Sequence, residues 1–297
     1  MKTTLHTKIL PELAKKHKFE IINYSSKDIS TIKNGKKVQN VYYFEFNCNN
    51  LTNAIITKDK SQVYKILSKN NIDAVEHTYL NYATSNETAL EYLYKHGKIV
   101  VKKQDGTCGE DVFLVTNKDE LFKAINILKI KGQNINICPY INIEKECRAI
   151  CINGDVELIY EKDRPYVIGN GMSTVTQLSI AKYNTIFSNI KSYDLIPAKN
   201  QKIFLTWQHN LCKGSTPIVL TDSYLKTQIK DLAIKTANVL GLNCCSVDCV
   251  LSKGSLKVLE VNSGIMMEKF AEQSTANYLI AKNIYEKLLI SGFKPAI

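Results

Sequence analysis

The sequence lacks several features that would assign it to a particular class of protein. No uninterrupted apolar stretch is long enough to cross a bilayer. The first 18 residues carry lysine and histidine but no apolar core of the kind that a secretory signal needs. No long polar tract is present, which argues against wholesale disorder. We therefore expect a folded, cytoplasmic protein that does not use a membrane as a partner.

The nine cysteines also lack the usual metal and disulfide spacings. Their number is odd, no Cys-x-x-Cys pair occurs, and the five histidines are scattered. Cys147 and Cys151 are four residues apart, as are Cys245 and Cys249, and in a strand this spacing puts both thiols on one face. We interpret these residues as free thiols that act as small buried hydrophobes.

The net charge is strongly positive, but no single segment accounts for it. The chain has 39 Lys and Arg against 28 Asp and Glu, which gives a formal charge of +11. The lysines are spread along the chain, with no block of five basic residues and no aromatic-rich RNA-binding signature. Nucleic acid is therefore disfavoured as the main ligand. The positive charge is also compatible with acidic or phosphorylated ligands.

The apolar pattern predicts a mixture of short helices and strands. With 297 residues and 44% hydrophobic content, the chain can form one large domain or two to three smaller ones. Asn153-Gly154 and Lys253-Gly254 are hairpin signals, and no internal repeat is visible. The fold class is thus α+β or α/β. The predicted strands are residues 19–24, 41–46, 54–57, 98–102, 112–115, 135–141, 148–152, 156–160, 244–251 and 256–261, and the predicted helices are 59–70, 88–96, 119–129, 173–182, 222–240 and 274–289.

Residues 100–112 suggest a phosphate-binding loop between two strands. Gly106 and Gly109 would let backbone N–H groups approach a phosphate closely, and Lys102 would add a fixed positive charge. The segment is not a P-loop, because no Gly-Lys-Ser/Thr follows. An ordinary glycine-containing hairpin fits the same residues.

The hairpin at residues 246–262 suggests a metal site. Alternation puts Glu260 and Asn262 on one face of the second strand and Leu259 and Val261 on the other. Asp248 on the preceding strand can face the same way. Two carboxylates and an amide supply the hard oxygen ligands that Mg²⁺ prefers. A solvated sheet face with acidic residues is the alternative.

A third segment combines basic residues with a tight turn. Arg148 and the run 161–165 are followed by a Gly-x-Gly turn at 169–171 and a Ser/Thr-rich helix start. This combination suits phosphate or carboxylate binding, although surface hairpins have similar sequences.

Taken together and in this order, these segments resemble the ATP-grasp superfamily. The likeness is to the branch with the ribosomal-protein glutamate ligase, cyanophycin synthetase and bacterial glutathione-forming ligases, and it runs from about residue 57 to 290. The resemblance implies two α+β subdomains that sandwich ATP, with boundaries at 1–57 for a short N-terminal α/β region, 58–140 and 141–297. It rests on TKDKSQVYKIL, VVKKQDGTCGEDV, CPYINIEKECRAIC, RPYVIGNGMSTVTQL, HNLCKGS and SVDCVLSKGSLKVLEVNSG.

The resemblance also implies a role for individual residues. Asp248, Glu260 and Asn262 match the metal ligands, and residues 214–216 would cradle a substrate carboxylate. The residues expected to act on the transferred phosphate are Arg148, Lys162 and Asn210. Those expected to bind ATP are Lys60 and Lys102 at the phosphates or adenine, Gly106, Thr107, Cys108 and Gly109 in a closing loop, Pro139, Tyr140 and Ile141 at an adenine hinge, and Glu146 at the ribose.

Three positions depart from the pattern of this superfamily. Lys103 stands where proline is usual, and Asn170 stands where relatives often have Asp. Gln208 stands where the glutamate-ligase branch has Arg, which removes an expected cation, and Lys213 or His209 is a candidate substitute. The region before residue 58 is short, so no acceptor-recognition residue is assigned.

The resemblance implies an ATP-dependent ligase that uses Mg²⁺ or Mn²⁺. A carboxylate of an amino acid or peptide substrate would be activated as an acyl phosphate and joined to an amine acceptor. Homodimers are common in this superfamily, so the resemblance also suggests a homodimer. A thiol acceptor is a variant of this reading. The alternatives are a non-catalytic ATP-binding protein of the same fold and a basic nucleic-acid-binding protein.

Overall fold

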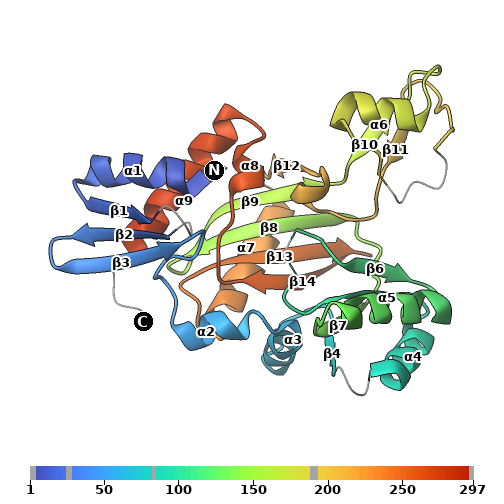
Figure 1. Ribbon diagram of the computed structural model, residues 1–297, viewed down its shortest axis with the longest axis horizontal. Coiled ribbons are helices and arrows are strands. Elements are labelled where there is room, and N and C mark those ends of the chain that lie inside the picture. Colours follow the sequence, from blue (N-terminus) through green and yellow to red (C-terminus); the bar gives the residue numbers. More distant parts are fainter. Residues whose placement is uncertain are drawn as a thin grey trace.

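The chain folds around two antiparallel sheets, one of five strands and one of four, and residues from both line one cleft. Figure 1 shows the larger sheet at the centre of the molecule and the smaller one at the lower right. This computed structural model describes residues 5–24, 29–81, 85–106, 108–187, 193–221 and 223–293. Within those ranges the strands form sheets of five, four, three and two strands. The five-stranded and four-stranded sheets position the candidate site.

The four-stranded sheet has the order β4-β7-β5-β6 and is covered on one face by two helices. Ile99 and Val101 pack against these helices, whereas Val100 and Lys102 point to the opposite face, as alternation along a strand requires. Its elements are β4 (Thr78–Leu80), β5 (Ile99–Lys103), β6 (Val112–Val115), β7 (Ile135–Pro139), α4 (Ser85–His96) and α5 (Lys118–Ile130).

The five-stranded sheet has the order β12-β9-β8-β13-β14 and is covered on one face by α7 (Tyr224–Val239) and α3 (Lys60–Lys69). The strands are β8 (Lys145–Ile152), β9 (Asp155–Asp163), β12 (Thr216–Val219), β13 (Cys244–Ser252) and β14 (Ser255–Asn262). Cys147 pairs with Cys249 and Cys151 with Cys245, and all four are buried against the helices. They are small buried hydrophobes, as the sequence predicts, and all nine cysteines are free.

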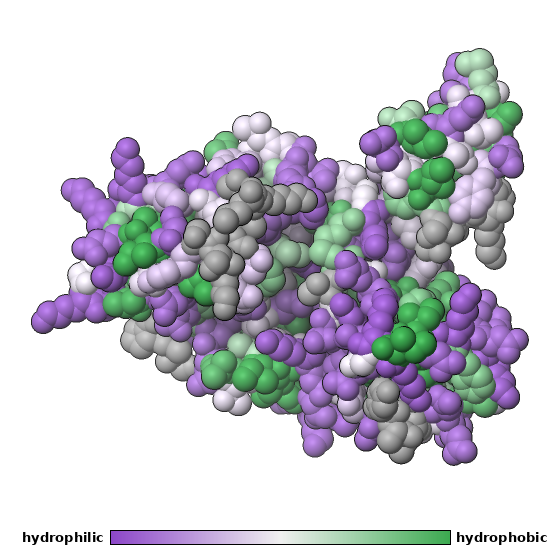
Figure 2. Space-filling view, in the orientation of Figure 1, coloured by the Kyte–Doolittle hydropathy of each residue, from purple (hydrophilic) through white to green (hydrophobic). Residues whose placement is uncertain are grey.

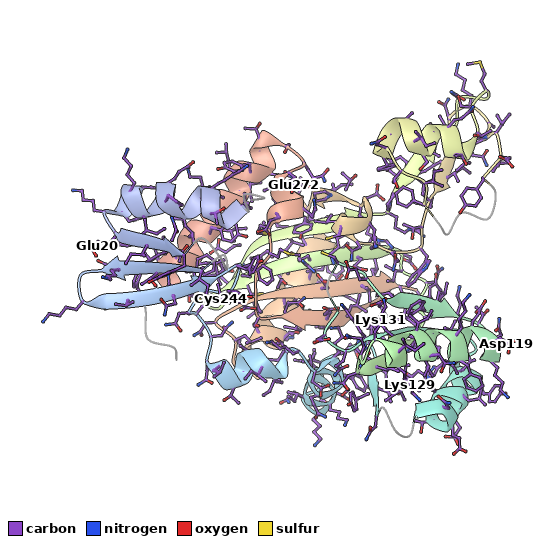
Figure 3. The ribbon with its side chains drawn as sticks, in the orientation of Figure 1. Glu20, Asp119, Lys129, Lys131, Cys244 and Glu272 are labelled. Atoms are coloured by element: carbon purple, nitrogen blue, oxygen red, sulfur yellow. The ribbon has the colours of Figure 1, made fainter. Side chains whose placement is uncertain are left out.

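The N-terminal and C-terminal segments share one core on the other face of this sheet. Leu10 and Ile32 from the N-terminal region pack with Ile284 and Tyr160. Cys244 lies at the junction (Figure 3), where the Asn49 side chain bonds both its backbone N–H and its carbonyl, at 2.9 and 2.7 Å. The elements are α1 (Leu5–His17), β1 (Glu20–Tyr24), β2 (Ile29–Asn34), β3 (Lys37–Tyr42), α8 (Glu268–Ala271) and α9 (Thr275–Ser291).

A small module projects from the end of β9. It contains β10 (Tyr166–Ile168), α6 (Val175–Tyr183) and β11 (Lys202–Phe204), built on a minor core of Val167, Val175 and Leu205. The 3-10 helix η1 (Leu211–Lys213) brings the chain back to β12. Figure 2 shows a mostly hydrophilic surface, with apolar side chains gathered over α2 (Leu51–Ile56) and over this module. No helix in the described ranges is both long and apolar enough to span a membrane.

The sequence-based assignment of elements is wrong in two places. Residues 54–57, predicted as a strand, belong mostly to α2, which the Asn50 side chain caps by accepting a bond from the Thr52 N–H at 2.9 Å. The predicted strand at 41–46 ends at Tyr42, because Tyr43 takes a left-handed conformation with φ of 52°. The elements that were not predicted are helices α1 and α8, the 3-10 helix η1, and strands β2, β4, β10, β11 and β12.

Candidate active site

The cleft between the two large sheets has a volume of about 490 Å³ and gathers the predicted site residues. Every residue predicted to bind ATP, the metal ion or the transferred phosphate that the structure describes lines this cleft, and Thr107 lies outside the described residues. The lining residues from the prediction are Lys60, Lys102, Gly106, Cys108, Gly109, Pro139, Tyr140, Ile141, Glu146, Arg148, Lys162, Asn210, Asp248, Glu260 and Asn262.

The floor of the cleft is the open face of β8, β9, β13 and β14. Neighbouring side chains on these strands point alternately to α7 and to the cleft. Asp248 lies opposite Arg148 on β8 and opposite Glu260 on β14, and Ser246 lies opposite Asn262. The pairing of antiparallel strands thus brings residues 148, 248 and 260 side by side although they are far apart in sequence.

A β-bulge alters the predicted phase of β14. The register shifts between Asp248 and Cys249, which pair with Glu260 and Val258, so that Leu259 is the extra residue. Val261 packs against the helices, as predicted, but Leu259 lines the cleft together with Glu260. The prediction that Leu259 shares a face with Val261 is therefore wrong, because simple alternation does not allow for an inserted residue.

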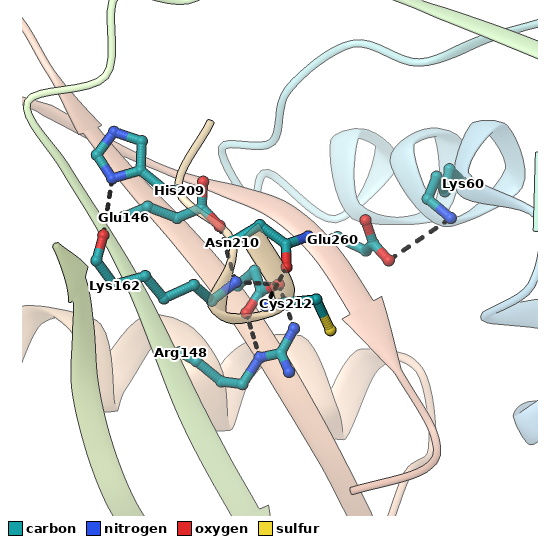
Figure 4. Close-up of polar contacts among 9 residues, drawn as sticks. Lys60, Glu146, Arg148, Lys162, His209, Asn210, Cys212 and Glu260 are labelled. Carbon is teal, nitrogen blue, oxygen red and sulfur yellow. Dashed lines mark hydrogen bonds and ion pairs between the residues drawn. The ribbon is translucent and has the colours of Figure 1, made fainter. Parts of the chain in front are cut away.

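Four charged side chains, three of them buried and Arg148 half-buried, form a chain of ion pairs on the cleft floor (Figure 4). Lys162 donates to Glu146 Oε1 at 2.7 Å and to Asp248 Oδ2 at 2.8 Å. Arg148 binds Asp248 in a bidentate manner, with Nε to Oδ1 at 2.7 Å and Nη2 to Oδ2 at 2.8 Å. Two anions and two cations balance one another, which is the condition for keeping charges out of water.

The two carboxylates of this network differ in their affinity for protons. Burial raises the pKa of Glu146 above its ordinary value, and the attraction of Lys162 offsets this only in part. Burial also acts to raise the pKa of Asp248, but Arg148 and Lys162 outweigh it and hold that pKa far below its usual range. Asp248 is thus the firmly ionised member of the pair.

A second charged contact joins the two halves of the cleft. Lys60, at the start of α3, lies 3.5 Å from Glu260 Oε1 and donates to the Gln104 carbonyl at 3.0 Å. Asp59 caps α3 and also accepts a bond from Gln104 Nε2 at 2.6 Å. Burial raises the pKa of Glu260, but Lys60 and Lys102 outweigh this effect and lower it overall. The cleft therefore presents an ionised carboxylate beside the loop at 104–111.

The loop at residues 104–111 reaches across to η1. Cys108 and Gly109 both have positive φ values, of 54° and 67°. A Cβ atom on Gly109 would lie 2.8 Å from Asn210 Nδ2, so glycine allows the loop to approach this side chain closely. Asn210 in turn caps η1 by accepting a bond from the Cys212 N–H at 2.8 Å.

Part of the cleft is lined by apolar side chains, which we call the apolar slot. Val75, Val100 and Cys138 form its buried wall, with Leu259 and Trp207 packed against them. The Trp207 ring meets that of Tyr140 edge-on at a centroid distance of 6.0 Å. The predicted hinge at Pro139, Tyr140 and Ile141 runs past this slot from β7 toward β8.

His77 connects the two sheets beneath this slot. Its Nδ1 lies 2.8 Å from Asn136 Oδ1 on β7, and its Nε2 lies 3.0 Å from the Leu259 carbonyl on β14. Burial, followed by the charge of Lys102, lowers the pKa of His77 to about 3, so the ring is neutral. His77 thus anchors the bulge at Leu259 to the smaller sheet.

Some predicted features lie away from the cleft or act differently. The Gly-x-Gly turn at 169–171 lies on the projecting module, and Asn170 accepts bonds from the Met172 and Ser173 N–H groups, which occupies those donors. Residues 214–216 are not among the cleft-lining residues. Burial lowers the pKa of His209 to about 4, so it supplies no positive charge at neutral pH. Lys213, the other candidate for a substitute cation, is not among the cleft-lining residues.

Several cleft residues were missed by the sequence reasoning. Phe44 and Glu45 enter the cleft from the N-terminal region and press against Gly264, where a Cβ atom would lie 2.5 Å from each side chain. They precede the segment of the resemblance, so no signal pointed to them. Ser246 was detectable, because it lies two residues before Asp248 and so shares its strand face. Trp207 had only its adjacency to Gln208 as a signal.

Comparison with known proteins identifies this architecture. The bifunctional glutathione synthetase of Pasteurella multocida has a TM-score of 0.60 at 18% identity, with 96% of this chain and 44% of that chain covered. The D-alanine–D-alanine ligase of Bacillus anthracis has a TM-score of 0.56 at 19% identity, with 82% and 68% covered. At these identities the likeness shows the fold alone, and that fold is ATP-grasp.

The family follows from the sequence itself. The RimK-like ATP-grasp domain matches residues 57–164 and 176–288, and the chain belongs to this family. It is 27% identical over 247 residues to the glutathione biosynthesis bifunctional protein of Clostridium perfringens, covering 74% of this chain and 30% of the relative. It is 25% identical over 235 residues to the cyanophycin synthetase of Trichormus variabilis, covering 71% and 26%. The chain thus spans less than a third of the length of these relatives.

Proposed function

We propose that this protein is an ATP-dependent ligase that activates a carboxylate as an acyl phosphate and joins it to an amine. One observation carries the proposal: ionised Asp248 and Glu260, with Asn262, line the same cleft as the glycine loop and Lys60. Acidic oxygens opposite lysines and a glycine loop suit a nucleotide whose phosphates are held by a cation.

The residues present fit a magnesium ion bound together with phosphates. The described residues contain no cluster of three His, Cys, Asp or Glu side chains that would cage a metal by themselves. Mg²⁺ is usually held by one or two carboxylates together with substrate phosphates, and Asp248, Glu260 and Asn262 provide such a set. The ion, Mg²⁺ or Mn²⁺, would neutralise charge on the phosphates as one of them is transferred.

The proposed nucleotide position follows from polarity. The apolar slot at Val100, Cys138 and Leu259 suits an adenine ring, with the backbone of the 139–141 hinge reading its edge. Glu146 would face the ribose; in this structure Lys162 occupies its carboxylate, so that role requires Lys162 to move. The phosphates would then lie between the loop at 104–111 and the carboxylates of β13 and β14.

The proposed reaction needs no side-chain nucleophile. A carboxylate oxygen of the substrate attacks the γ-phosphorus and ADP leaves; an amine nitrogen then attacks the acyl carbon, phosphate leaves, and a proton is released. Arg148 and Lys162 would stabilise charge on the transferred group, and Asn210 would donate to it. The 104–111 loop, closed against Asn210, would keep water from the acyl phosphate.

The remaining expectations belong to the same proposal. We infer that residues 58–140 and 141–297 act as the two halves that clasp the nucleotide, with 1–57 as an N-terminal addition. The substrates are an amino acid or peptide carboxylate and an amine acceptor. Nine free thiols fit a reducing compartment, the cytoplasm. A homodimer is expected, and light scattering of the purified protein would establish the mass in solution.

Thermal stabilisation by a non-hydrolysable ATP analogue tests the nucleotide site. A ligand that binds only the native state stabilises it by about 2.7 kcal/mol at a concentration of 100 Kd. We expect a Mg²⁺-dependent rise in melting temperature that shrinks in Glu260→Gln. The matched control is Glu161→Gln, because Glu161 pairs with Lys145 and does not line the cleft. The absence of any rise in the wild type at millimolar analogue contradicts the proposal.

ADP release in the presence of amino acids and peptides then tests catalysis. Substrate-dependent ADP release with formation of an amide supports the ligase. Nucleotide binding without turnover on any amine or thiol favours the non-catalytic alternative. Salt-sensitive binding to nucleic acid that ATP does not affect favours the other alternative, a basic nucleic-acid-binding protein.

A further inference from the structure

Two of the nine cysteines differ from the rest in their exposure. Cys108 and Cys212 are partly exposed, and the other seven are buried. They come from opposite sides of the cleft, Cys108 from the loop between β5 and β6 and Cys212 from η1. Among the nine cysteines, all of which the structure describes, the two that solvent reagents can reach therefore lie on two elements that approach each other beside the cleft.

These two elements approach each other closely where Gly109 meets Asn210. The Cβ position of Gly109 lies 2.8 Å from Asn210 Nδ2 and 3.8 Å from Lys213 Cε. Cys108 immediately precedes Gly109, and Asn210 Oδ1 accepts the N–H of Cys212 at 2.8 Å. Figure 4 shows Cys212 beside Asn210 on η1. The close approach of Gly109 to Asn210 thus also brings the thiols of Cys108 and Cys212 near each other.

The electrostatic surroundings agree with this placement. Burial, and then hydrogen bonding with the thiol of Cys108, raise the pKa of Cys212 to about 12. The pKa of Lys269 is raised mainly by its bond to Glu272, and further by both thiols. The positive charges of Lys269 and Arg148 act in the opposite direction on the pKa of Cys212 and offset its rise only in part, so Cys212 is protonated at neutral pH and is not the thiol that peroxide attacks first.

We propose that Cys108 and Cys212 form a reversible disulfide that fastens the 104–111 loop to η1. With hydrogen peroxide as the oxidant, the two S–H bonds break, one S–S bond forms, and the two protons and two electrons reduce the peroxide to two molecules of water. A dithiol reductant reverses the reaction by thiol–disulfide exchange.

The consequence for the site rests on the proposed function. If the loop closes over the phosphates of ATP, a bond between Cys108 and η1 prevents it from opening. Nucleotide bound before oxidation is then retained, and nucleotide added afterwards cannot reach the site. Oxidation would therefore halt turnover while leaving Arg148, Lys162 and Asn210 chemically unchanged.

Two other pairs of neighbouring thiols provide an internal comparison. Cys48 lies beside Cys244, and Cys151 beside Cys245, but all four are buried. Their burial shields them from peroxide, so mild oxidation should modify the exposed pair first.

The test compares wild type with Cys212→Ser, since Cys212 does not line the cleft. Each protein is treated with hydrogen peroxide, digested without reductant and analysed by mass spectrometry. We expect a linked peptide with Cys108 and Cys212, two hydrogens lighter than its parts, in the wild type only. Release of a fluorescent ATP analogue bound before oxidation should slow at least about tenfold, because release requires the loop to open. Dithiothreitol should restore the original rate.

Hydrogen exchange of the loop amides gives a readout that needs no nucleotide. Oxidised wild type should exchange more slowly at residues 104–111 than reduced wild type or oxidised Cys212→Ser. No linked peptide, or a linked peptide with unchanged loop exchange, overturns the proposal. If the linked peptide and slower exchange appear but the reduced protein binds no ATP analogue, the disulfide stands and the proposed function fails.

Discussion

Lys162 is the buried cation on which the charge balance of the cleft floor depends. Its side chain is 6% exposed, and those of its two partners, Glu146 and Asp248, are 9% and 5% exposed. Substitution Lys162→Met keeps the aliphatic stem and removes the charge, leaving two buried carboxylates with Arg148 alone. Breaking a buried ion pair by removing one partner costs about 3–5 kcal/mol, and we expect a loss of stability of that size at pH 7.

The pH dependence of this loss identifies the group responsible. Arg148 keeps its bidentate bond to Asp248, so Glu146 is the carboxylate left without a partner. Burial already raises the folded-state pKa of Glu146 above its unfolded value, and losing Lys162 raises it further. A raised pKa means that the folded state binds more protons, so stability is full at low pH and falls as pH rises through the folded pKa. The deficit of the variant relative to wild type should therefore shrink on acidification from pH 8 to pH 5.

Urea unfolding, followed by fluorescence and circular dichroism together, measures this deficit and checks for two-state behaviour. The double variant Glu146→Gln/Lys162→Met should recover most of the loss, because both members of a pair are then removed. Lys145→Met is the matched control, because Lys145, on the neighbouring strand β8, also pairs with a glutamate, Glu161. The side chain of Lys145 is 42% exposed, so the loss of its charge should cost no more than about 1 kcal/mol of stability. A Lys162→Met deficit as small as that of the control, or one that does not change with pH, would refute the reasoning.

Three further predictions follow from single contacts. Gly109→Ala should weaken binding of the ATP analogue, because the new methyl group meets Asn210 and because the left-handed conformation costs about 1–2 kcal/mol. Gly132→Ala controls for the conformation alone, since Gly132 has a φ of 65° and a Cβ atom there would have nothing within 4 Å. Equal effects of the two substitutions on binding would contradict a role for the contact with Asn210. His77 has its pKa lowered to about 3, so wild-type stability should fall by about 1.4 kcal/mol per pH unit more steeply than that of His77→Gln as pH drops below 6.5, and parallel pH curves would exclude the neutral buried ring. Phe270→Ala should lower the free energy of unfolding by about 3–5 kcal/mol in urea titrations, since the ring is fully buried in the shared core, and a loss below 1 kcal/mol would show that the core collapses to fill the cavity.

Local patterns predicted the elements that carry the candidate site. The hairpins around Asn153-Gly154 and Lys253-Gly254 are present, because turn residues and alternating strands fix both the connection and the face. The bulge at Leu259 was not predictable in this way. The bulged residue has a tertiary partner, since His77 from another segment bonds the Leu259 carbonyl, and no property of residues 255–262 alone indicates that partner.

The sequence by itself determined which residue types could do chemistry and which segments would carry them. Asp248, Glu260 and Lys60 could be selected because carboxylates amid apolar strand residues need compensation, and because the ordered motifs resemble a known superfamily. Only the tertiary structure decided their partners. Lys162 could equally have faced solvent, and it instead neutralises Glu146 and Asp248 because three strands set it between them. Charge pairs and loop contacts join residues that are far apart in the chain. Local sequence patterns therefore do not specify these contacts, which form only when the sheets assemble.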